Sequence, residues 1–119
     1  MCSVQGNIYL VGGSFDGRRV SEFNPRSRTW RDIAPMQQER YGGHSVCVVD
    51  TKMFVVGFMT CEMLDLSQDD PQWRHIESMN KRHRFGDAVV FGKKIYVVGG
   101  IDDESVEVYD VEQGNFHNV

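Results

Sequence analysis

The sequence predicts an all-β protein built from a repeated unit of short antiparallel strands. Apolar runs rich in β-branched and aromatic residues end on glycines, as in IYLVGG at residues 8–13 and IYVVGG at residues 95–100. A run such as SVEVY at residues 105–109 follows, and its alternation of apolar and polar residues is typical of a half-buried strand. No stretch longer than about ten residues keeps an apolar period near 3.6, so no helix is expected.

The repeat has four elements in a fixed order, at a period of about 43 residues. They are an apolar run, a run that ends on glycine, an alternating run, and a segment that carries an aromatic residue. The apolar runs are 44–50 and 87–92, the glycine runs are 10–13, 55–58 and 97–100, the alternating runs are 21–25, 61–66 and 106–111, and the aromatic residues are Trp30, Trp73 and Phe116. Four short strands at a period of 40–50 residues predict the blades of a β-propeller.

The composition excludes several functional classes. The chain of 119 residues has 17 acidic and 13 basic residues and a formal net charge of −4, with scattered lysines and arginines, which argues against nucleic-acid binding. No apolar stretch approaches the roughly 20 residues needed to cross a bilayer, so no membrane partner is expected. The N-terminus lacks the pattern of a signal peptide, and three cysteines without a CxxC pair predict no disulfide framework. A cytoplasmic location is therefore expected.

These motifs resemble the kelch repeat over nearly the whole chain, from Asn7 to Val119. The double glycine is followed by an aromatic residue about nine positions later and by a second aromatic residue about seven positions after that. Ala34-Pro35-Met36, with Arg40 and an apolar strand after it, is similar to the connection between blades in kelch-like proteins. WD-type repeats have a similar length, but they end in Trp-Asp, which this sequence lacks.

The resemblance implies that a set of glycines and aromatic residues packs within and between blades, with the glycines ending the second strand where backbones crowd. These residues are Gly12, Gly13, Gly57, Gly99, Gly100, Tyr109, Trp30 and Trp73. The middle unit departs from the pattern, because Phe58 replaces the second glycine and Leu64 replaces the tyrosine. We expect a degenerate blade there, with a shortened loop.

The predicted units divide the chain into residues 1–52, 53–94 and 95–119. The first range holds strands two to four of the first unit, because MCSVQ is too short for a further strand. The first strand of the second unit lies at the end of the first range, and the first strand of the third unit lies at the end of the second range. Eleven strands in about three blades do not close a ring, since propellers need roughly four to eight blades. We expect a partial kelch propeller, with a piece of a longer kelch protein favoured over a truncated gene product or a half-ring that dimerises toward six blades.

No catalytic, metal or cofactor site is expected. The four histidines show no HxH or HExxH spacing, Asp102 and Asp103 lack the EF-hand pattern, and the serines lack a G-x-S-x-G context. Cys61 is expected to be a buried structural residue rather than a reactive thiol.

Function is expected on the loops, where a rigid scaffold presents its contacts. The candidate residues for binding a protein or short, possibly acidic, peptide lie in the connections between units and in the loops after the glycines. They are Arg40, Tyr41, Arg82, His83, Arg84, Ser14, Phe15, Asp16, Ile101 and Asp102. Arg and Tyr are enriched at protein-binding hot spots, and in kelch-like proteins the position matched by Arg84 often contacts acidic peptides.

Three functions follow from the resemblance. The favoured one is a substrate-recognition propeller of a kelch-like adaptor, which delivers targets to a cullin-type ubiquitin ligase through BTB and BACK domains that this sequence does not contain. A structural kelch protein that binds actin and a fragment of a galactose-oxidase-like copper enzyme are the alternatives. The favoured function is not enzymatic.

Overall fold

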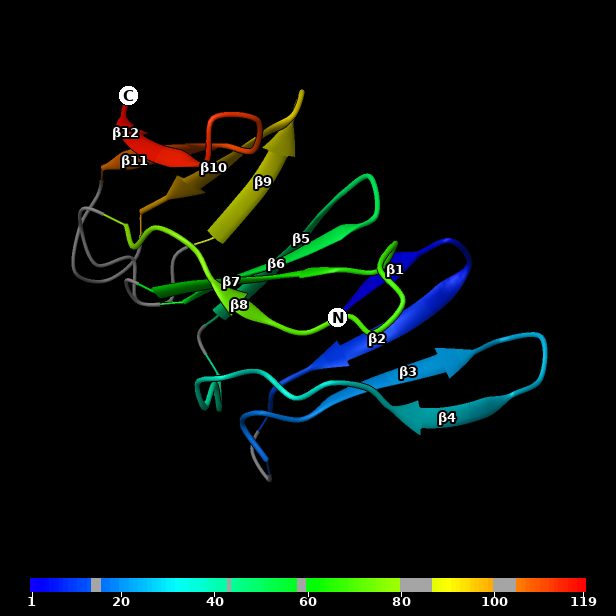
Figure 1. Ribbon diagram of the computed structural model, residues 1–119. Coiled ribbons are helices and arrows are strands. Elements are labelled where there is room, and N and C mark those ends of the chain that lie inside the picture. Colours follow the sequence, from blue (N-terminus) through cyan, green and yellow to red (C-terminus); the bar gives the residue numbers. More distant parts are fainter. Residues whose placement is uncertain (14–15, 43, 58–59, 80–86, 100–104) are drawn as a thin grey trace.

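The computed structural model describes residues 1–13, 16–42, 44–57, 60–79, 87–99 and 105–119. Within these ranges the chain forms twelve strands and no helix, arranged as three four-stranded antiparallel sheets (Figure 1). The described part therefore has no helix that could cross a membrane. The predicted all-β class and the open array of four-stranded units are confirmed.

Each sheet is a simple meander in chain order, so neighbouring strands in the sequence are also neighbours in space. The first sheet holds β1 (Cys2–Val4), β2 (Asn7–Val11), β3 (Val20–Asn24) and β4 (Thr29–Asp32). The second holds β5 (His44–Val49), β6 (Lys52–Gly57), β7 (Thr60–Asp65) and β8 (Arg74–His75). The third holds β9 (Asp87–Phe91), β10 (Lys94–Val98), β11 (Val106–Asp110) and β12 (Asn115–Asn118).

The three sheets follow one another through space in chain order and do not close into a ring (Figure 1). Strand β5 contacts both β1 and β9, so the first strands of the sheets lie side by side. Strands β4, β8 and β12 form the opposite edges of their sheets. This is the arrangement of consecutive propeller blades around part of an axis.

The prediction of eleven strands is wrong, because β1 provides a first strand for the first sheet. Its three residues pair with β2 in antiparallel register, from Cys2 opposite Tyr9 to Val4 opposite Asn7. Gln5 and Gly6 both have positive φ, 50° and 85°, as a two-residue hairpin turn requires. The Gln-Gly pair was the signal in the sequence that marked this short hairpin.

Two apolar clusters fill the boundaries between the sheets, because successive residues of each strand point to opposite faces. We call the face that looks toward the following sheet the front face and the other the rear face. In β6, Met53 and Val55 pack on the first sheet, whereas Phe54 and Val56 pack toward the third. The continuous apolar run of this strand is thus buried on both faces.

The hairpins between the third and fourth strands share one stabilising contact. Asn24, Asp65 and Asp110 stand at the same position of the repeat, and each accepts hydrogen bonds from the backbone two residues later. Such side-chain-to-backbone bonds fix a turn locally. They fix each turn through contacts that lie within one hairpin.

Candidate functional site

The loops of the first sheet gather at one end of the strands, which we call the loop face. It contains the described residues between β2 and β3, which are 12–13 and 16–19, and the described residues between β4 and β5, which are 33–42. Two backbone hydrogen bonds join these segments: Gly13 N donates to Arg40 O at 3.0 Å, and Arg40 N donates to Gly17 O at 2.7 Å. The connection to the second sheet is therefore held against the loop of the first.

The side chain of Arg40 is only 3% exposed and points into the boundary between the first two sheets. Its Nη2 and Nε atoms donate to Glu62 Oε2 at 3.1 and 3.3 Å, and Nη1 donates to Thr60 O at 3.4 Å. This differs from the surface position that the sequence suggested for Arg40. The physical reason is the buried carboxylate of Glu62, which offers the long guanidinium an ion pair inside the protein.

Glu62 also anchors the connection itself. Its carboxylate is fully buried and accepts the backbone amides of Gln37 at 2.6 Å and Gln38 at 3.2 Å. A buried carboxylate needs such partners, because an unpaired charge in the interior is strongly unfavourable. Sequence reasoning missed this role, although a glutamate within the alternating run CEMLDL was the available signal.

Glycines surround Arg40 where a side chain would collide with it. A Cβ atom at Gly12, whose φ is +72°, would lie 2.4 Å from Arg40 O, and one at Gly17 would lie 2.7 Å from Arg40 N. At Gly57 it would lie 3.0 Å from Arg40 Nη1. Gly13 is different, since its Cβ position is free of described neighbours.

Tyr41 and Asp16 are exposed on the loop face. Tyr41 is 53% exposed, and a hydrogen bond with Glu39 raises the pKa of its hydroxyl. Asp16 accepts the backbone amide of Arg18 at 3.1 Å. The other candidate partner-binding residues, Ser14, Phe15, Arg82, His83, Arg84, Ile101 and Asp102, lie outside the described residues, as does Gly100.

The two tryptophans of the repeat have different environments. Trp73 is buried on the rear face of the second sheet, and its Nε1 donates to Ala34 O at 2.8 Å. Trp30 is 55% exposed on the rear face of the first sheet, where its ring contacts Phe23 at a centroid distance of 4.8 Å. Trp30 thus packs within its own sheet, and no described sheet lies behind it.

Tyr109 packs between two aromatic rings in the boundary of the second and third sheets. The centroid of its ring lies 4.9 Å from that of Phe116 and 5.9 Å from that of Phe54. Cys61, in the same cluster, is buried, and burial raises the pKa of its thiol to about 12. This thiol is protonated at neutral pH, which suits a structural role.

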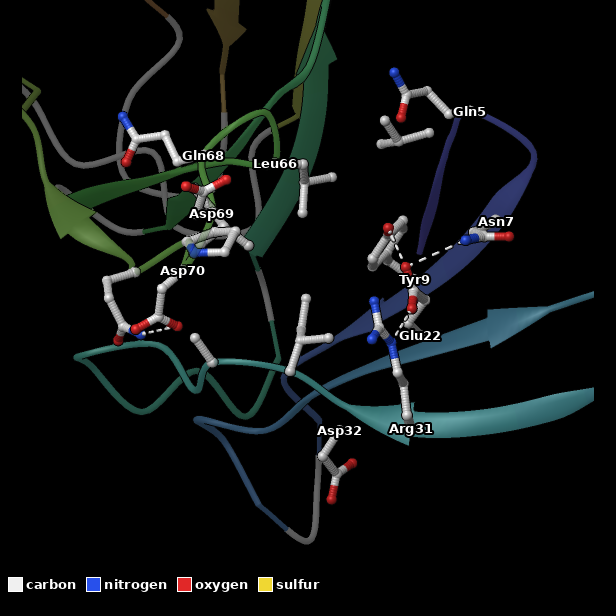
Figure 2. Close-up of a pocket in the computed structure, with 16 residues that line it drawn as sticks. Gln5, Asn7, Tyr9, Glu22, Arg31, Asp32, Leu66, Gln68, Asp69 and Asp70 are labelled. Atoms are coloured by element: carbon white, nitrogen blue, oxygen red, sulfur yellow. Dashed lines mark hydrogen bonds and ion pairs between the residues drawn. The ribbon is translucent and has the colours of Figure 1, made fainter.

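A polar cleft of about 570 Å³ lies between the first two sheets and extends from the β1–β2 turn at Gln5 to Ala34 in the connection after β4 (Figure 2). Glu22 lines it from the first sheet: Tyr9 Oη donates to Glu22 Oε2 at 2.5 Å, Asn7 Nδ2 donates to the same atom at 3.2 Å, and Arg31 forms an ion pair with Oε1. Burial alone would raise the pKa of Glu22, but these partners together hold it below its usual range. Burial and the bond to Glu22 raise the pKa of Tyr9.

The rim of the cleft is acidic on the side of the second sheet. Asp69 and Asp70 belong to the long segment between β7 and β8, and Gln68 precedes them (Figure 2). Within the described ranges, no three His, Cys, Asp or Glu side chains are grouped as a metal site requires. Sequence reasoning did not find this cleft, because its residues come from two different sheets.

The three four-stranded sheets, repeated in chain order, define the class of protein as an array of propeller blades. Two segments match family models described as the kelch motif, residues 1–37 and residues 83–119. The chain belongs to the kelch-repeat family and contains part of such a repeat array. The middle unit lies between the two matched segments, where the sequence departs most from the pattern.

Curated relatives share this assignment. The chain is 28% identical to Kelch-like protein 23 of Pongo abelii over 92% of its length, and 31% identical to Kelch-like protein 35 of Mus musculus over 85%. It is 26% identical to Kelch repeat and BTB domain-containing protein 12 of Homo sapiens over 83%. The chain spans about a fifth of these relatives, with values of 22%, 19% and 19% of their lengths.

Proposed function

We propose that this chain is a protein-interaction module whose loop face binds a protein or peptide target, as part of a kelch-like substrate adaptor for a cullin-type ubiquitin ligase. The kelch motifs at both ends of the chain support an interaction role more than any other observation. The ligase role rests on similarity to the kelch-like relatives, one of which is named for a BTB domain.

Residues of the connections carry the proposed contacts. Tyr41 offers a large ring with a polar tip, and Arg82 and Arg84, at the next connection, offer guanidinium groups that suit acidic side chains. Arg40 has a different role in this proposal. Its buried ion pair with Glu62 positions Tyr41, its neighbour in the chain, rather than contacting the target.

Binding is tested with a peptide library displayed against the purified chain, followed by affinity measurements on the selected peptides. We expect acidic peptides, and we expect Tyr41→Ala and Arg84→Ala each to weaken binding by roughly 1–3 kcal/mol, or about 5- to 150-fold. Gln68→Ala, at the opposite end of the strands, is the matched control. Binding that depends on Gln68 and not on Tyr41 or Arg84 would place the site in the cleft of Figure 2 instead.

The adaptor role has a separate test. The natural protein that carries this segment should co-precipitate a cullin, and a target that binds through Tyr41 should become ubiquitylated in its presence. Target binding without any cullin would retain the interaction module and remove the ligase role. Co-sedimentation with filamentous actin that Tyr41→Ala abolishes would favour the structural role instead.

A further inference from the structure

One wall of the cleft in Figure 2 is a segment that is longer in the second sheet than in the other two. The third and fourth strands are joined by residues 25–28 in the first sheet and by residues 111–114 in the third, but by residues 66–73 in the second. Strand β8 has only two residues, Arg74–His75, and residues 68–72 line the cleft. The cleft is therefore a feature of this one boundary and not of the repeat in general.

The cleft lies between two sheets that the structure describes. A sheet that preceded the first would pack on its rear face, and a sheet that followed the third would pack on its front face. Tyr9, Glu22 and Arg31, which line the cleft, form a row of paired residues on the front face of the first sheet. That face already packs toward the second sheet, where Tyr9 shares a cluster with Leu64. Further units of the array would leave this cleft open.

The carboxylates on the side of the first sheet are neutralised within that sheet. Glu22 forms an ion pair with Arg31, and Asp32 forms one with Arg19 at 2.9 Å. The guanidinium of Arg31 lies beside Glu22, away from the opposite wall (Figure 2). This side of the cleft therefore has no net charge left to neutralise.

The opposite wall carries two carboxylates, Asp69 and Asp70, across the cleft from Glu22 (Figure 2). Both are exposed, and neither forms an ion pair with a described residue. Asp70 Oδ1 accepts a hydrogen bond from Gln72 Nε2 at 3.3 Å, which leaves the negative charge in place. A cation that entered the cleft would meet a negative potential on this wall.

The rest of the cleft suits the other parts of a basic residue. Ala34, Leu66 and Pro71 are half-buried and line it with apolar surface. Lysine and arginine cover such surface with their aliphatic stems while the charged end contacts a polar group. The amides of Gln5 and Gln72 offer donors and acceptors to the backbone of a bound segment. The volume of about 570 Å³ lies within the roughly 300–1,000 Å³ of known ligand sites.

We propose that this cleft binds a lysine or arginine side chain of a partner protein, with the charged end at Asp69 and Asp70 and the stem on Leu66 and Pro71. The charge complementarity and the apolar lining together favour this occupant. The proposal is independent of target binding on the loop face, where acidic peptides are expected. Because the two sites prefer opposite charges, each can fail without the other.

The test is a selection of peptides from a displayed library on the purified chain, with counter-selection on the double variant Asp69→Asn/Asp70→Asn. We expect the peptides that only the native chain retains to share a lysine or arginine. Fluorescence anisotropy then measures the affinity of these peptides. Asp69→Asn and Asp70→Asn should each weaken binding by about 2- to 5-fold, and added salt should weaken binding to the native chain.

Two further variants locate the binding. Glu112→Gln is the matched control, because it removes one exposed charge from the equivalent hairpin of the third sheet, and it should leave the affinity unchanged. Gln72→Trp keeps the charge of the cleft and enlarges a side chain that lines it, so it should weaken binding. Far-UV circular dichroism checks that each variant keeps its strands.

Three outcomes would overturn the proposal. The first is a selection that retains no basic peptide. The second is an affinity that Asp69→Asn and Asp70→Asn leave unchanged, or that Glu112→Gln lowers equally. The third is binding that depends on the two aspartates but is not weakened by Gln72→Trp, because the peptide would then contact an exposed acidic turn and not the cleft.

Discussion

The rear faces of the first and second sheets have nearly the same chemistry and opposite environments. Both present apolar side chains, Ile8 and Phe23 on the first sheet and Met53 and Leu64 on the second, and a tryptophan at the same position of the repeat. On the second sheet this face is buried and Trp73 is 3% exposed, whereas on the first sheet Trp30 is 55% exposed. The difference shows that a repeat fixes which face is apolar, and that a neighbouring sheet decides whether that face contributes to stability.

Replacing each tryptophan by alanine gives the largest expected difference. Trp73→Ala should lower the free energy of unfolding by about 3–5 kcal/mol, because it leaves a cavity against Met36 and Leu64 and removes the bond to Ala34. Trp30→Ala should change it by no more than about 0.5 kcal/mol in dilute solution. Urea denaturation of both variants measures the two changes in the free energy of unfolding. Equal losses of stability would mean that the rear face of the first sheet is covered in solution.

A buried ion pair, Arg40 with Glu62, and an exposed one, Arg19 with Asp32, provide the next comparison. Arg40→Ala should cost about 3–5 kcal/mol, because it leaves the buried carboxylate of Glu62 without its cation. Arg19→Ala removes an exposed partner of Asp32 and should leave the melting temperature unchanged within error. Thermal unfolding followed by circular dichroism distinguishes the two, and a stable Arg40→Ala chain would contradict the structural role of this arginine.

Gly12 and Gly13 allow the same comparison of a crowded and an open position for the backbone. Both have positive φ, +72° and +133°, so alanine at either position should introduce strain of about 1–3 kcal/mol. Gly12→Ala should lose more, because its Cβ would lie 2.4 Å from Arg40 O, whereas no described atom lies within 4 Å of a Cβ at Gly13. Equal losses, measured by chemical denaturation, would show that crowding against Arg40 is relieved by a small backbone shift.

The smallest expected effect is a dependence of stability on pH that Glu22 provides at the cleft. Because its pKa is lowered in the folded state, its contribution is complete above the ordinary carboxyl pKa of about 4.3 and is lost as the pH falls through the lowered value. Glu22→Gln should therefore reduce the loss of stability between about pH 5 and pH 3. The control is Asp69→Asn on the rim, and a profile that Glu22→Gln leaves unchanged would contradict this role for the carboxylate.

Local sequence patterns determined most of the fold. Residues that alternate along a strand point to opposite faces, so the alternating run around Val108 predicted a strand and its apolar side, and the continuous apolar run around Val55 predicted a strand. Asn24, Asp65 and Asp110 mark turns that their own side chains stabilise. The spacing of about 43 residues between Trp30 and Trp73 predicted the repetition. All of these signals act over a few residues or repeat along the chain, so they can be recognised in the sequence without a structure.

The environments of Arg40, Trp30 and Glu22 were decided by the tertiary structure. Arg40 is buried because Glu62, on another sheet, lies within reach of its long side chain, and Glu22 is held by partners from β2 and β4. Trp30 is exposed because no described sheet lies behind the first. Burial and pairing depend on which surfaces meet across a boundary, and a pattern confined to one strand carries no information about the surface that it will face.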